Sequence, residues 1–473
     1  MAIAAPPLTL RTKLLFGFGS LSTGAVSVAF SAYLLLFYNQ VIGISAGLVS
    51  TAMLLALLVD ALADPIVGQV SDNMRSRWGR RHPMMYISAV PTAVAFALLF
   101  MPPSGWSEGE MFWWIFGLST MVRISSTLYE IPSLALTPEL SADYDQRTSL
   151  MSWRYFFGYI GGFGTATLAL ALFLRPSPTH PIGQLNPDGY AMYGLAGAAV
   201  IAVSILVSSL GTHSRIPFVR QASERSKMSF AGHFREMIVT VGHRGFLAIL
   251  AFGVLKFTAI GLYGGMALYF GTFLWELGPN ELAILTIDGV VSITVALLVA
   301  KRLSQRFGKR TVAIVMALAG VTIGVSPLVL REYGMFLPNG DPRLVWVLFA
   351  IQAIYGTFAA ISSILVASMV ADVVEDSAIR TGRHSSGLFF AASAFMQKCT
   401  GALGIVAAGA LLTFVQFPRG AKPGTVSPEI IDALARTYVP VVMVLWFVGV
   451  CFLTFYRIDR TSHEANLRKL EAA

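Results

Sequence analysis

The sequence predicts an all-α integral membrane protein with twelve transmembrane helices in two six-helix halves. Three observations carry this prediction. Hydrophobic residues make up 55% of the 473 residues and charged residues only 12%, whereas soluble domains are about 25% charged. Apolar runs that reach the roughly 20 residues needed to cross a bilayer occur twelve times. Two loop motifs also recur between the halves. The short segments of alternating hydrophobicity that are typical of a membrane β-barrel are absent from the sequence.

The apolar runs fall into two groups of six on either side of a polar stretch. The predicted helices of the first half are 14–40, 46–70, 84–102, 111–137, 149–174 and 189–211. Those of the second half are 245–275, 281–300, 311–330, 344–371, 385–416 and 437–456. We therefore expect an N-terminal bundle over 1–211, a linker over 212–244, a C-terminal bundle over 245–457 and a tail over 458–473. Within the linker, residues 230–241 place apolar side chains on one helical face, which indicates a short helix on the membrane surface or packed on the bundle.

The net charge of +9 is distributed as in a membrane protein rather than a nucleic-acid-binding one. Of the 34 Lys and Arg residues, four lie inside predicted helices. With both termini inside, 24 of the remaining 30 fall on the termini and the loops on their side, and six on the opposite side. This positive-inside bias predicts cytoplasmic termini and a multi-pass protein of the plasma (inner) membrane.

Two loop motifs of the first half recur in the second half, and both are displaced by nearly the same number of residues. The stretch RWGRR at 77–81, after the second helix, returns as RFGKR at 306–310, after the eighth. The stretch DYDQRT at 143–148, after the fourth helix, is answered by EDSAIRT at 375–381, after the tenth. Arg77 and Arg306 are 229 residues apart, and Arg147 and Arg380 are 233 apart. The pattern indicates a parallel six-plus-six repeat with a cavity between the halves near the midplane.

Two carboxylates lie inside the second helix, in LLVDALADPIVG at 57–68. Asp60 and Asp64 are four residues apart and therefore share a helix face. A carboxylate near the bilayer centre costs at least ~2.5–3.5 kcal/mol on insertion scales, and two close anions resist joint ionisation unless a cation lies between them. Pro65 leaves the Ala61 carbonyl without its helical partner and so available to an ion. This favours a cation site over two structural salt bridges.

Other polar groups interrupt the apolar runs. Thr127 and Glu130 lie three apart on one face of the fourth helix, Arg154 lies in the fifth and Lys398 in the eleventh. If these converge on Asp60 and Asp64, the site holds three carboxylates and two cations.

Three further charges and one loop are harder to place. Arg123 is expected near a helix end, with its head reaching the interface. Lys256 and Asp288 have no partner that the sequence assigns. In the loop after the second helix, Gly68 and Asp72 suggest close helix packing and a contact to an arginine or a helix end, which anchoring by positive charge alone does not explain.

These segments resemble the glycoside–pentoside–hexuronide:cation symporters, the melibiose-carrier-like branch of the major facilitator superfamily. The matching segments are DALADPIVGQVSDNMRSRWGRR (60–81), YEIPSLALTPELSADYDQRTSLMSWR (129–154) and ADVVEDSAIRTGRHSSGLFFAASAFMQKCTGALG (371–404). The resemblance implies the major facilitator fold and cation-coupled symport of a sugar or glycoside by alternating access. It also implies a cation site at Asp60, Asp64 and Thr127, with Glu130 serving both cation and sugar. Arg154 matches a sugar-site arginine and Lys398 a lysine of the eleventh helix, so both are expected at the solute. Separately from the resemblance, the charged loops predict gating residues: Gly68, Asp72, Arg77, Arg147, Arg306 and Arg380.

The chain departs from the family pattern at three positions. An Asn common before the second aspartate is Ala63, the acid of the first helix is Gly24, and a tryptophan that can stack on a sugar is Leu134. The loss of the amide oxygen leaves Na⁺ and H⁺ coupling both open, so that Na⁺ at Asp60 and Asp64 is one of two alternatives. Gly24 stands at a substrate-binding position in a small-residue stripe that would equally serve helix packing.

The altered sugar positions keep a second solute class open, namely an amphipathic or lysolipid-like molecule. A membrane enzyme is disfavoured because no HExxH or Walker sequence is present, and GISAG at 43–47 joins two helices rather than a strand and a helix. A channel is disfavoured because no filter loop or ring of identical groups is present. We therefore expect a monomeric carrier with no cofactor beyond its coupling ion and no nucleic-acid partner.

Overall fold

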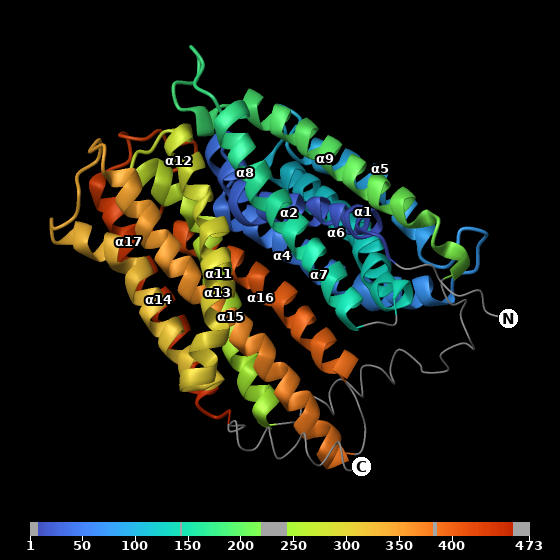
Figure 1. Cartoon of the computed structure of the whole chain (residues 1–473). Coiled ribbons are helices and arrows are strands. Elements are labelled where there is room, and N and C mark those ends of the chain that lie inside the picture. Colours follow the sequence, from blue (N-terminus) through green and yellow to red (C-terminus); the bar gives the residue numbers. More distant parts are fainter. Residues whose placement is uncertain (1–7, 142–143, 219–243, 382–385, 457–473) are drawn as a thin grey trace. The chain divides into compact units, whose positions relative to one another are not determined.

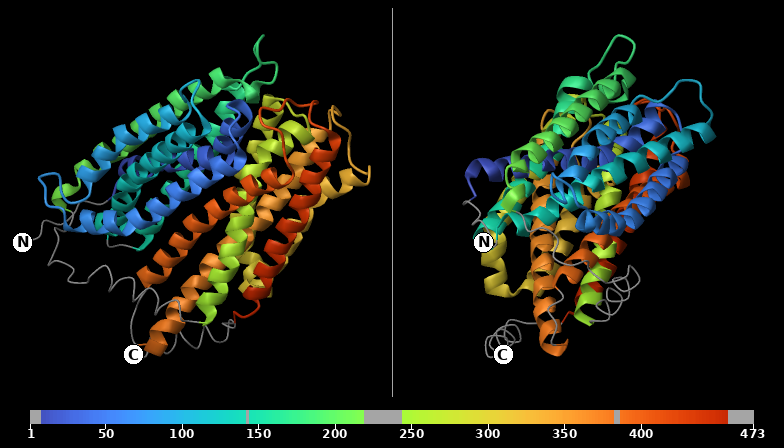
Figure 2. Two further views of the ribbon diagram at one scale, coloured as in Figure 1. Left: turned by 180° about the vertical axis from the view of Figure 1, so that it is seen from behind. Right: turned by 90° about the vertical axis from the view of Figure 1, so that its right-hand side faces the viewer.

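The computed structural model describes residues 8–141, 144–218, 244–381 and 386–456, and within these ranges the secondary structure is helical with no strand. Contacts divide the chain into two units. The first holds the described residues up to Phe218 together with 278–283 and 419–421, and the second holds the rest. Figure 1 shows that the helices of each unit run side by side as a bundle, and the further views of Figure 2 agree.

Six membrane-spanning segments build the first unit. The first segment consists of α1 (Leu10–Phe18), α2 (Ser20–Val28), the π-helical turn η1 (Ala29–Tyr33), α3 (Leu34–Leu36) and η2 (Phe37–Val41). The next three are α4 (Ala46–Asn73), α5 (His82–Leu99) and α6 (Glu108–Leu140). The fifth consists of α7 (Tyr144–Tyr159), η3 (Ile160–Gly164), α8 (Thr165–Leu168) and η4 (Ala169–Phe173). After the short η5 (Gly183–Leu185), α9 (Pro187–His213) is the sixth, followed by η6 (Ile216–Phe218).

Six further segments follow in the second half of the chain. The seventh is α11 (Arg244–Tyr269) with η7 (Phe270–Leu274), and the eighth is α12 (Pro279–Thr286) with α13 (Asp288–Phe307). The remaining four are α14 (Lys309–Glu332), α15 (Leu344–Thr381), α16 (Ser386–Phe414) and α17 (Pro428–Leu453). Over their described residues, ten of the twelve segments are long and apolar enough to cross a membrane. The other two are α6, which carries Arg123 and Glu130, and α16, of which only part is described at the side-chain level.

The two units repeat one packing scheme. In the first unit α4 packs on α6, α5 on both α6 and α9, and α1 and α2 on α7. The second unit repeats these pairs as α13 on α15, α14 on α15 and α17, and α11 on α16. Each pair joins segments in the same order along its half of the chain, so the six-plus-six repeat predicted from the two loop motifs is a repeat of structure.

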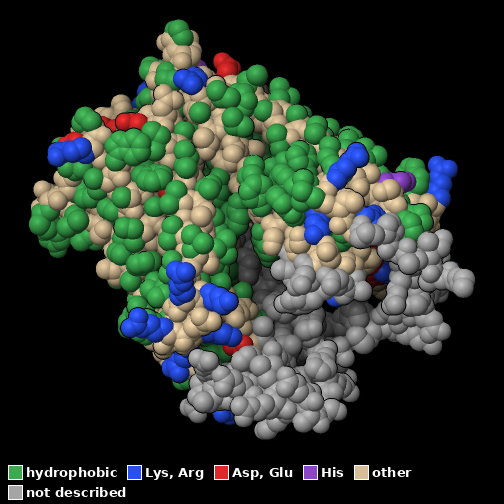
Figure 3. Space-filling view, in the orientation of Figure 1, with side chains coloured by type: hydrophobic (Ala, Val, Ile, Leu, Met, Phe, Trp, Pro, Cys, Tyr) green, Lys and Arg blue, Asp and Glu red, His purple; other side chains and the backbone are tan. Residues whose placement is uncertain are grey.

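Large apolar side chains lie exposed along the middle of the helices. Leu62, Trp113 and Leu298 are each about two-thirds exposed. Figure 3 shows hydrophobic side chains over the middle of the visible helices, with Lys and Arg gathered nearer their ends. Such a surface is stable when lipid covers it. The chain is therefore a multi-pass membrane protein.

Some sequence expectations change in detail. The predicted surface helix at 230–241 lies outside the described residues. The serine of the GISAG segment, Ser45, caps the start of α4 by accepting a hydrogen bond from the Leu48 backbone N–H at 3.3 Å. Ser45 therefore has a structural role, in keeping with the chance match inferred from sequence.

Gly24 lies where α2 meets α7 and η3. A Cβ added at Gly24 would lie 2.0 Å from the Gly158 carbonyl oxygen and 2.6 Å from the Gly162 nitrogen. Real Cβ atoms do not approach backbone atoms so closely, so only glycine allows these helices their present separation. Of the two interpretations left open by the sequence, this geometry favours helix packing over substrate contact.

We expect Gly24→Ala to destabilise the first unit by about 1–3 kcal/mol, the usual cost of overpacking, because α2 must move away from α7. Gly117→Ala is the matched control, since no atom lies within 4 Å of a Cβ added there. The measurement is the thermal unfolding midpoint of each purified variant in detergent. Equal midpoints for Gly24→Ala and wild type would show that the close approach is not a constraint.

Candidate cation and solute site

The Thr127 hydroxyl of α6 joins the two carboxylates of α4. Its Oγ1 lies 2.8 Å from Asp60 Oδ1 and 3.0 Å from Asp64 Oδ1. Asp60 is only 2% exposed, and Thr127 is buried as well. The helical spacing of four residues puts both acids on the face of α4 that packs on α6. The three residues that sequence reasoning grouped as a cation site therefore lie together.

This arrangement couples the charges of the two acids. A hydroxyl has one hydrogen to donate, yet two carboxylate oxygens lie within hydrogen-bond distance of Thr127 Oγ1. The two oxygens are therefore less than about 6 Å apart, a separation at which like charges raise the cost of joint ionisation. A proton on one acid, or a cation held by both, relieves that repulsion. The site can thus take up one positive charge of either kind.

Arg123 is part of this site, which corrects the expectation that it reaches the interface from a helix end. It lies near the middle of α6, with Nη1 3.8 Å from Asp60 Oδ2. Its guanidinium also lies 4.7 Å from the centre of the Phe30 ring in η1. The expectation failed because the partner acid is on another helix, 63 residues earlier in the chain. At 3.8 Å, which is close to the longest distance of an ion pair, Arg123 partly offsets the negative charge of Asp60.

A second buried polar contact joins α7 to the next turns of α6. Arg154 of α7 is buried, and its Nη1 donates a hydrogen bond to Ser133 Oγ at 2.6 Å. Its guanidinium also lies 5.4 Å from the centre of the Phe16 ring. Glu130 stands one turn before Ser133 on α6, yet no ion pair joins Glu130 to a described cation. The structure therefore brings Arg154 to the same helix face as Glu130 without pairing the two.

The remaining solute-site predictions have different outcomes. Lys398 belongs to α16, but its side chain lies outside the described residues. Leu134, which stands at the position of the family's tryptophan, is 48% exposed. Among the described side chains, no group of three or more His, Cys, Asp or Glu could hold a metal ion.

Ion pairs tie the loops to the ends of the helices in both units. Arg80 and Arg81 both contact Glu139 near the end of α6, the latter at 3.0 Å. Arg81 also reaches Asp72 at 2.6 Å. In the second unit, Lys309 contacts Asp372 of α15 at 2.6 Å.

These pairs escaped the sequence analysis although their spacing contained the signal. Lys309 follows Arg80 by 229 residues and Asp372 follows Glu139 by 233, the same offsets as in the two repeated motifs. The repeat therefore preserves an ion pair between the loop after its second helix and the end of its fourth helix.

The predicted gating residues occupy different surroundings. Asp72 pairs with Arg81 but is 56% exposed. Arg77 and Arg306 are exposed and lie over neighbouring rings, those of Trp78 and Phe307. Arg147 donates a hydrogen bond to the Ser141 carbonyl at 2.7 Å.

Two further gating predictions have separate outcomes. The side chain of Arg380 lies outside the described residues. A Cβ at Gly68 would lie 3.8 Å from Ile131 Cγ2, so close packing does not require glycine there, contrary to the prediction.

The comparisons with known proteins agree with this geometry. A family model described as MFS/sugar transport protein matches residues 15–460. The chain belongs to this family. The fold, the family resemblance drawn from the motifs and the assignment to transporters rather than enzymes are thereby confirmed.

Individual relatives are distant but cover nearly the whole chain. A putative glycoside/cation symporter, YagG of Escherichia coli (strain K12), is 24% identical over 98% of this chain and 95% of its own length. The sodium-dependent lysophosphatidylcholine symporter 1 of Mus musculus is 22% identical over 98% and 89%. The inward-open structure of the xylose transporter XylE from E. coli superimposes with a TM-score of 0.61 at 15% identity, covering 96% of this chain and 98% of that one.

We expect the buried ion pair at Glu139 to contribute more to stability than the exposed one at Asp72. Glu139→Gln leaves two arginines without their shared carboxylate and should cost about 1–3 kcal/mol. Asp72→Asn, the matched control, removes a largely exposed pair worth about 0.2–1 kcal/mol. Thermal unfolding of the purified variants compares them, and an equal or larger loss for Asp72→Asn would contradict this ranking.

Proposed function

We propose that this chain is a secondary active symporter, which couples the downhill movement of Na⁺ or H⁺ to the uptake of a small organic solute. The single observation that carries the proposal is the Thr127 hydroxyl shared by Asp60 and Asp64. A site that takes up one positive charge inside a membrane is what coupling requires, because ion occupancy must change the energy of the loaded carrier. Family membership and the structural repeat support alternating access around this site.

A sugar or glycoside is the solute class that we favour. The support comes from the similarity to YagG, a putative glycoside/cation symporter, and from Arg154, a buried donor whose guanidinium retains hydrogen-bonding positions beyond Ser133. The second candidate is an amphipathic or lysolipid-like solute. Its support comes from the mouse lysophosphatidylcholine symporter and from the aliphatic, half-exposed Leu134 where a sugar-stacking ring would stand.

The setting of the carrier belongs to the same proposal. We place it in the plasma (inner) membrane with both termini in the cytoplasm, following the excess of Lys and Arg on one side. We infer a monomer that uses a coupling cation and no other cofactor, and that has lipid rather than nucleic acid as its surroundings. The ion pairs Arg80–Glu139 and Lys309–Asp372 would then lie at the cytoplasmic ends of the two bundles.

We expect Asp60→Asn and Asp64→Asn each to abolish accumulation of solute against its gradient, because one neutral amide removes the charge repulsion that a cation relieves. Asp188→Asn, which changes an exposed carboxylate at the start of α9, is the matched control and should transport normally. The measurement is uptake into proteoliposomes under an imposed ion gradient, with melibiose, xylose and a lysophosphatidylcholine as test solutes. Normal accumulation by both site variants would refute the coupling role.

Replacement of Thr127 separates its hydroxyl from its shape. Thr127→Ser keeps the bridging oxygen and should preserve coupling, whereas Thr127→Val leaves the two carboxylates without it and should raise the half-maximal cation concentration about tenfold, which corresponds to one hydrogen bond to a charged group. Uptake is measured with and without Na⁺ at fixed pH, and under a pH gradient in Na⁺-free buffer. Equal cation dependence of the Ser and Val variants would exclude the hydroxyl from the site.

The choice between Na⁺ and H⁺ follows from the same assay. A proton needs only one carboxylate of suitable affinity, whereas Na⁺ needs several oxygens around it. Ala63 contributes no oxygen to such a shell. If Na⁺ is the coupling ion and its shell is short of one ligand, Ala63→Asn should lower the half-maximal Na⁺ concentration. Stimulation by Na⁺ that Ala63→Asn leaves unchanged would show that ligand number is not limiting.

A further inference from the structure

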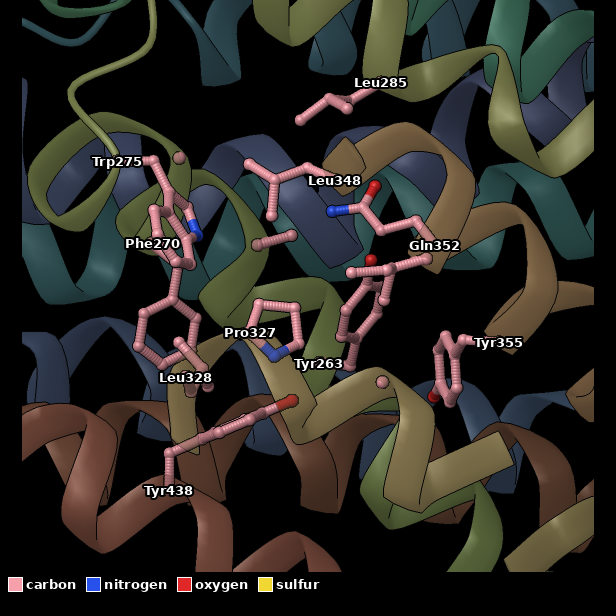
Figure 4. A pocket seen from close by; sticks show the side chains of 14 residues that line it. Tyr263, Phe270, Trp275, Leu285, Pro327, Leu328, Leu348, Gln352, Tyr355 and Tyr438 are labelled. Atoms are coloured by element: carbon pink, nitrogen blue, oxygen red, sulfur yellow. The ribbon is translucent and has the colours of Figure 1, made fainter. Parts of the chain in front are cut away.

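A cavity lies inside the second unit, apart from Asp60 and Asp64, which belong to the first. Its walls come from α11, η7 with the following Trp275, α12, α14, α15 and α17, and its volume is about 60 Å³. Five aromatic side chains and one amide dominate the lining, and Figure 4 shows them arranged around it: Tyr263, Phe270, Trp275, Gln352, Tyr355 and Tyr438. The other lining groups are mostly aliphatic.

The aromatic wall is held in place by close contacts. The rings of Tyr263 and Tyr355 lie 5.4 Å apart between centres, and those of Phe270 and Tyr438 lie 4.9 Å apart. A Cβ added at Gly324 would lie 2.9 Å from the Tyr355 ring, so glycine there makes room for the ring. The rings are therefore fixed before any ligand arrives.

The polar groups of this wall are not used within the protein. Among the described residues, the hydroxyls of Tyr263, Tyr355 and Tyr438 and the amide of Gln352 make no hydrogen bond. Tyr438 is buried, whereas Tyr263, Gln352 and Tyr355 are half-buried beside the cavity. Polar groups that converge on a cavity without a partner in the protein are available to a ligand. Four such groups around one cavity point to a binding site.

A carboxylate, that of Asp288, lies near two of these tyrosines without lining the cavity itself. Asp288 opens α13 after the break at Ile287, and α13 is fixed on α15 by the hydrogen bond from Ser292 Oγ to the Ala353 carbonyl at 3.0 Å. A Cβ added at Gly356, the neighbour of Tyr355, would lie 3.9 Å from Asp288 Oδ2.

No opposite charge accompanies this acid. Both Tyr263 and Tyr355 interact electrostatically with Asp288. Asp288 accepts a hydrogen bond from the Gly289 backbone, and no Lys or Arg among the described residues pairs with it. The buried lysine of this unit, Lys256, instead donates to Ser363 Oγ at 2.5 Å.

We propose that this aromatic cavity binds an organic ammonium group, with Asp288, near Tyr263 and Tyr355, supplying the opposing charge. Aromatic faces attract cations through the ring quadrupole, and the attraction grows when water is excluded. A carboxylate inside a membrane protein calls for a positive partner. The ring wall and the acid together therefore select a cation that tolerates an apolar surface.

Two other ligand classes fit this cavity less well. A neutral sugar would leave the charge of Asp288 uncompensated, and a site for a whole drug-sized ligand is usually about 300–1,000 Å³. An inorganic cation needs several oxygen ligands, whereas rings and aliphatic groups make up most of this lining. A methylated or primary ammonium group compensates the charge of Asp288. It also suits the small volume of the cavity when the rest of the molecule that carries it lies outside.

The test is equilibrium binding of choline to the purified full chain, with isothermal titration calorimetry, without an ion gradient or transported solute. We expect saturable binding that tetramethylammonium displaces and that neither Na⁺ nor xylose displaces at equal concentration. Asp288→Asn should weaken binding about tenfold or more, which is a loss of about 1.4 kcal/mol. Tyr355→Phe keeps the ring and should bind nearly as wild type, whereas Tyr355→Leu removes the ring and should bind more weakly.

Asp188→Asn, which changes an exposed carboxylate of the other unit, is the matched control, and choline binding should be unchanged in it. Gel filtration and the unfolding midpoint check that each variant is folded. If Asp288→Asn does not fold, the comparison of choline binding by Tyr355→Leu and Tyr355→Phe still tests the proposal. Absence of choline binding to wild type, equal binding by Tyr355→Leu and Tyr355→Phe, or displacement by Na⁺ as effective as by tetramethylammonium would each overturn the proposal. None of these outcomes depends on whether the chain transports a sugar with a cation.

Discussion

The hydroxyl of Thr127, held between the carboxylates of Asp60 and Asp64, is the interaction on which the rest of the structure depends. Two acids four residues apart in a membrane helix are costly, and the helix tolerates them because they face α6 rather than lipid. The packing of α4 on α6 therefore has to be close and fixed. Arg123 on the same helix offsets part of the charge at 3.8 Å from Asp60. The chain keeps a site whose energy changes with the arrival of a single positive charge, and this is the property that a coupled carrier needs.

The repeat of two six-helix halves puts the same framework around two different interiors. The second and fourth helices of each half pack together, and in both halves an ion pair joins the loop after the second helix to the end of the fourth, as Arg80–Glu139 and Lys309–Asp372. Inside the frame the chemistry diverges. The first unit has two acids, a hydroxyl and an arginine, whereas the corresponding helix pair of the second unit has Asp288 beside tyrosines. A repeat that conserves its end contacts and varies its interior lets one unit respond to a cation while the other takes a different ligand.

Local patterns were sufficient to predict the helices and the core of the site, because both follow from short-range rules. The twelve predicted runs correspond to twelve helical segments in the described part of the chain, ten of which are long and apolar enough to cross a membrane. A spacing of four residues puts Asp60 and Asp64 on one face, whereas the inclusion of Thr127 rested on the family resemblance. What the sequence did not predict depends on contacts between distant segments. Arg123 was misplaced because its partner lies on another helix, and Gly24 could be read as a solute contact until the backbone of Gly158 and Gly162 was found against it. Glu139 and Asp372 were overlooked although their spacing repeats the offsets of the loop motifs.

The measurement that tests the central claim most directly is infrared spectroscopy of the purified protein, which detects protonated carboxyl groups. Adding Na⁺ at fixed pH, or lowering the pH in Na⁺-free buffer, should change the carboxyl bands of the wild type, because the site takes up one positive charge. The part of this change that comes from the two acids should be lost in the double variant Asp60→Asn/Asp64→Asn. Wild-type and double-variant spectra that respond equally to Na⁺ and to pH would show that Thr127 does not mark a site for an exchangeable positive charge.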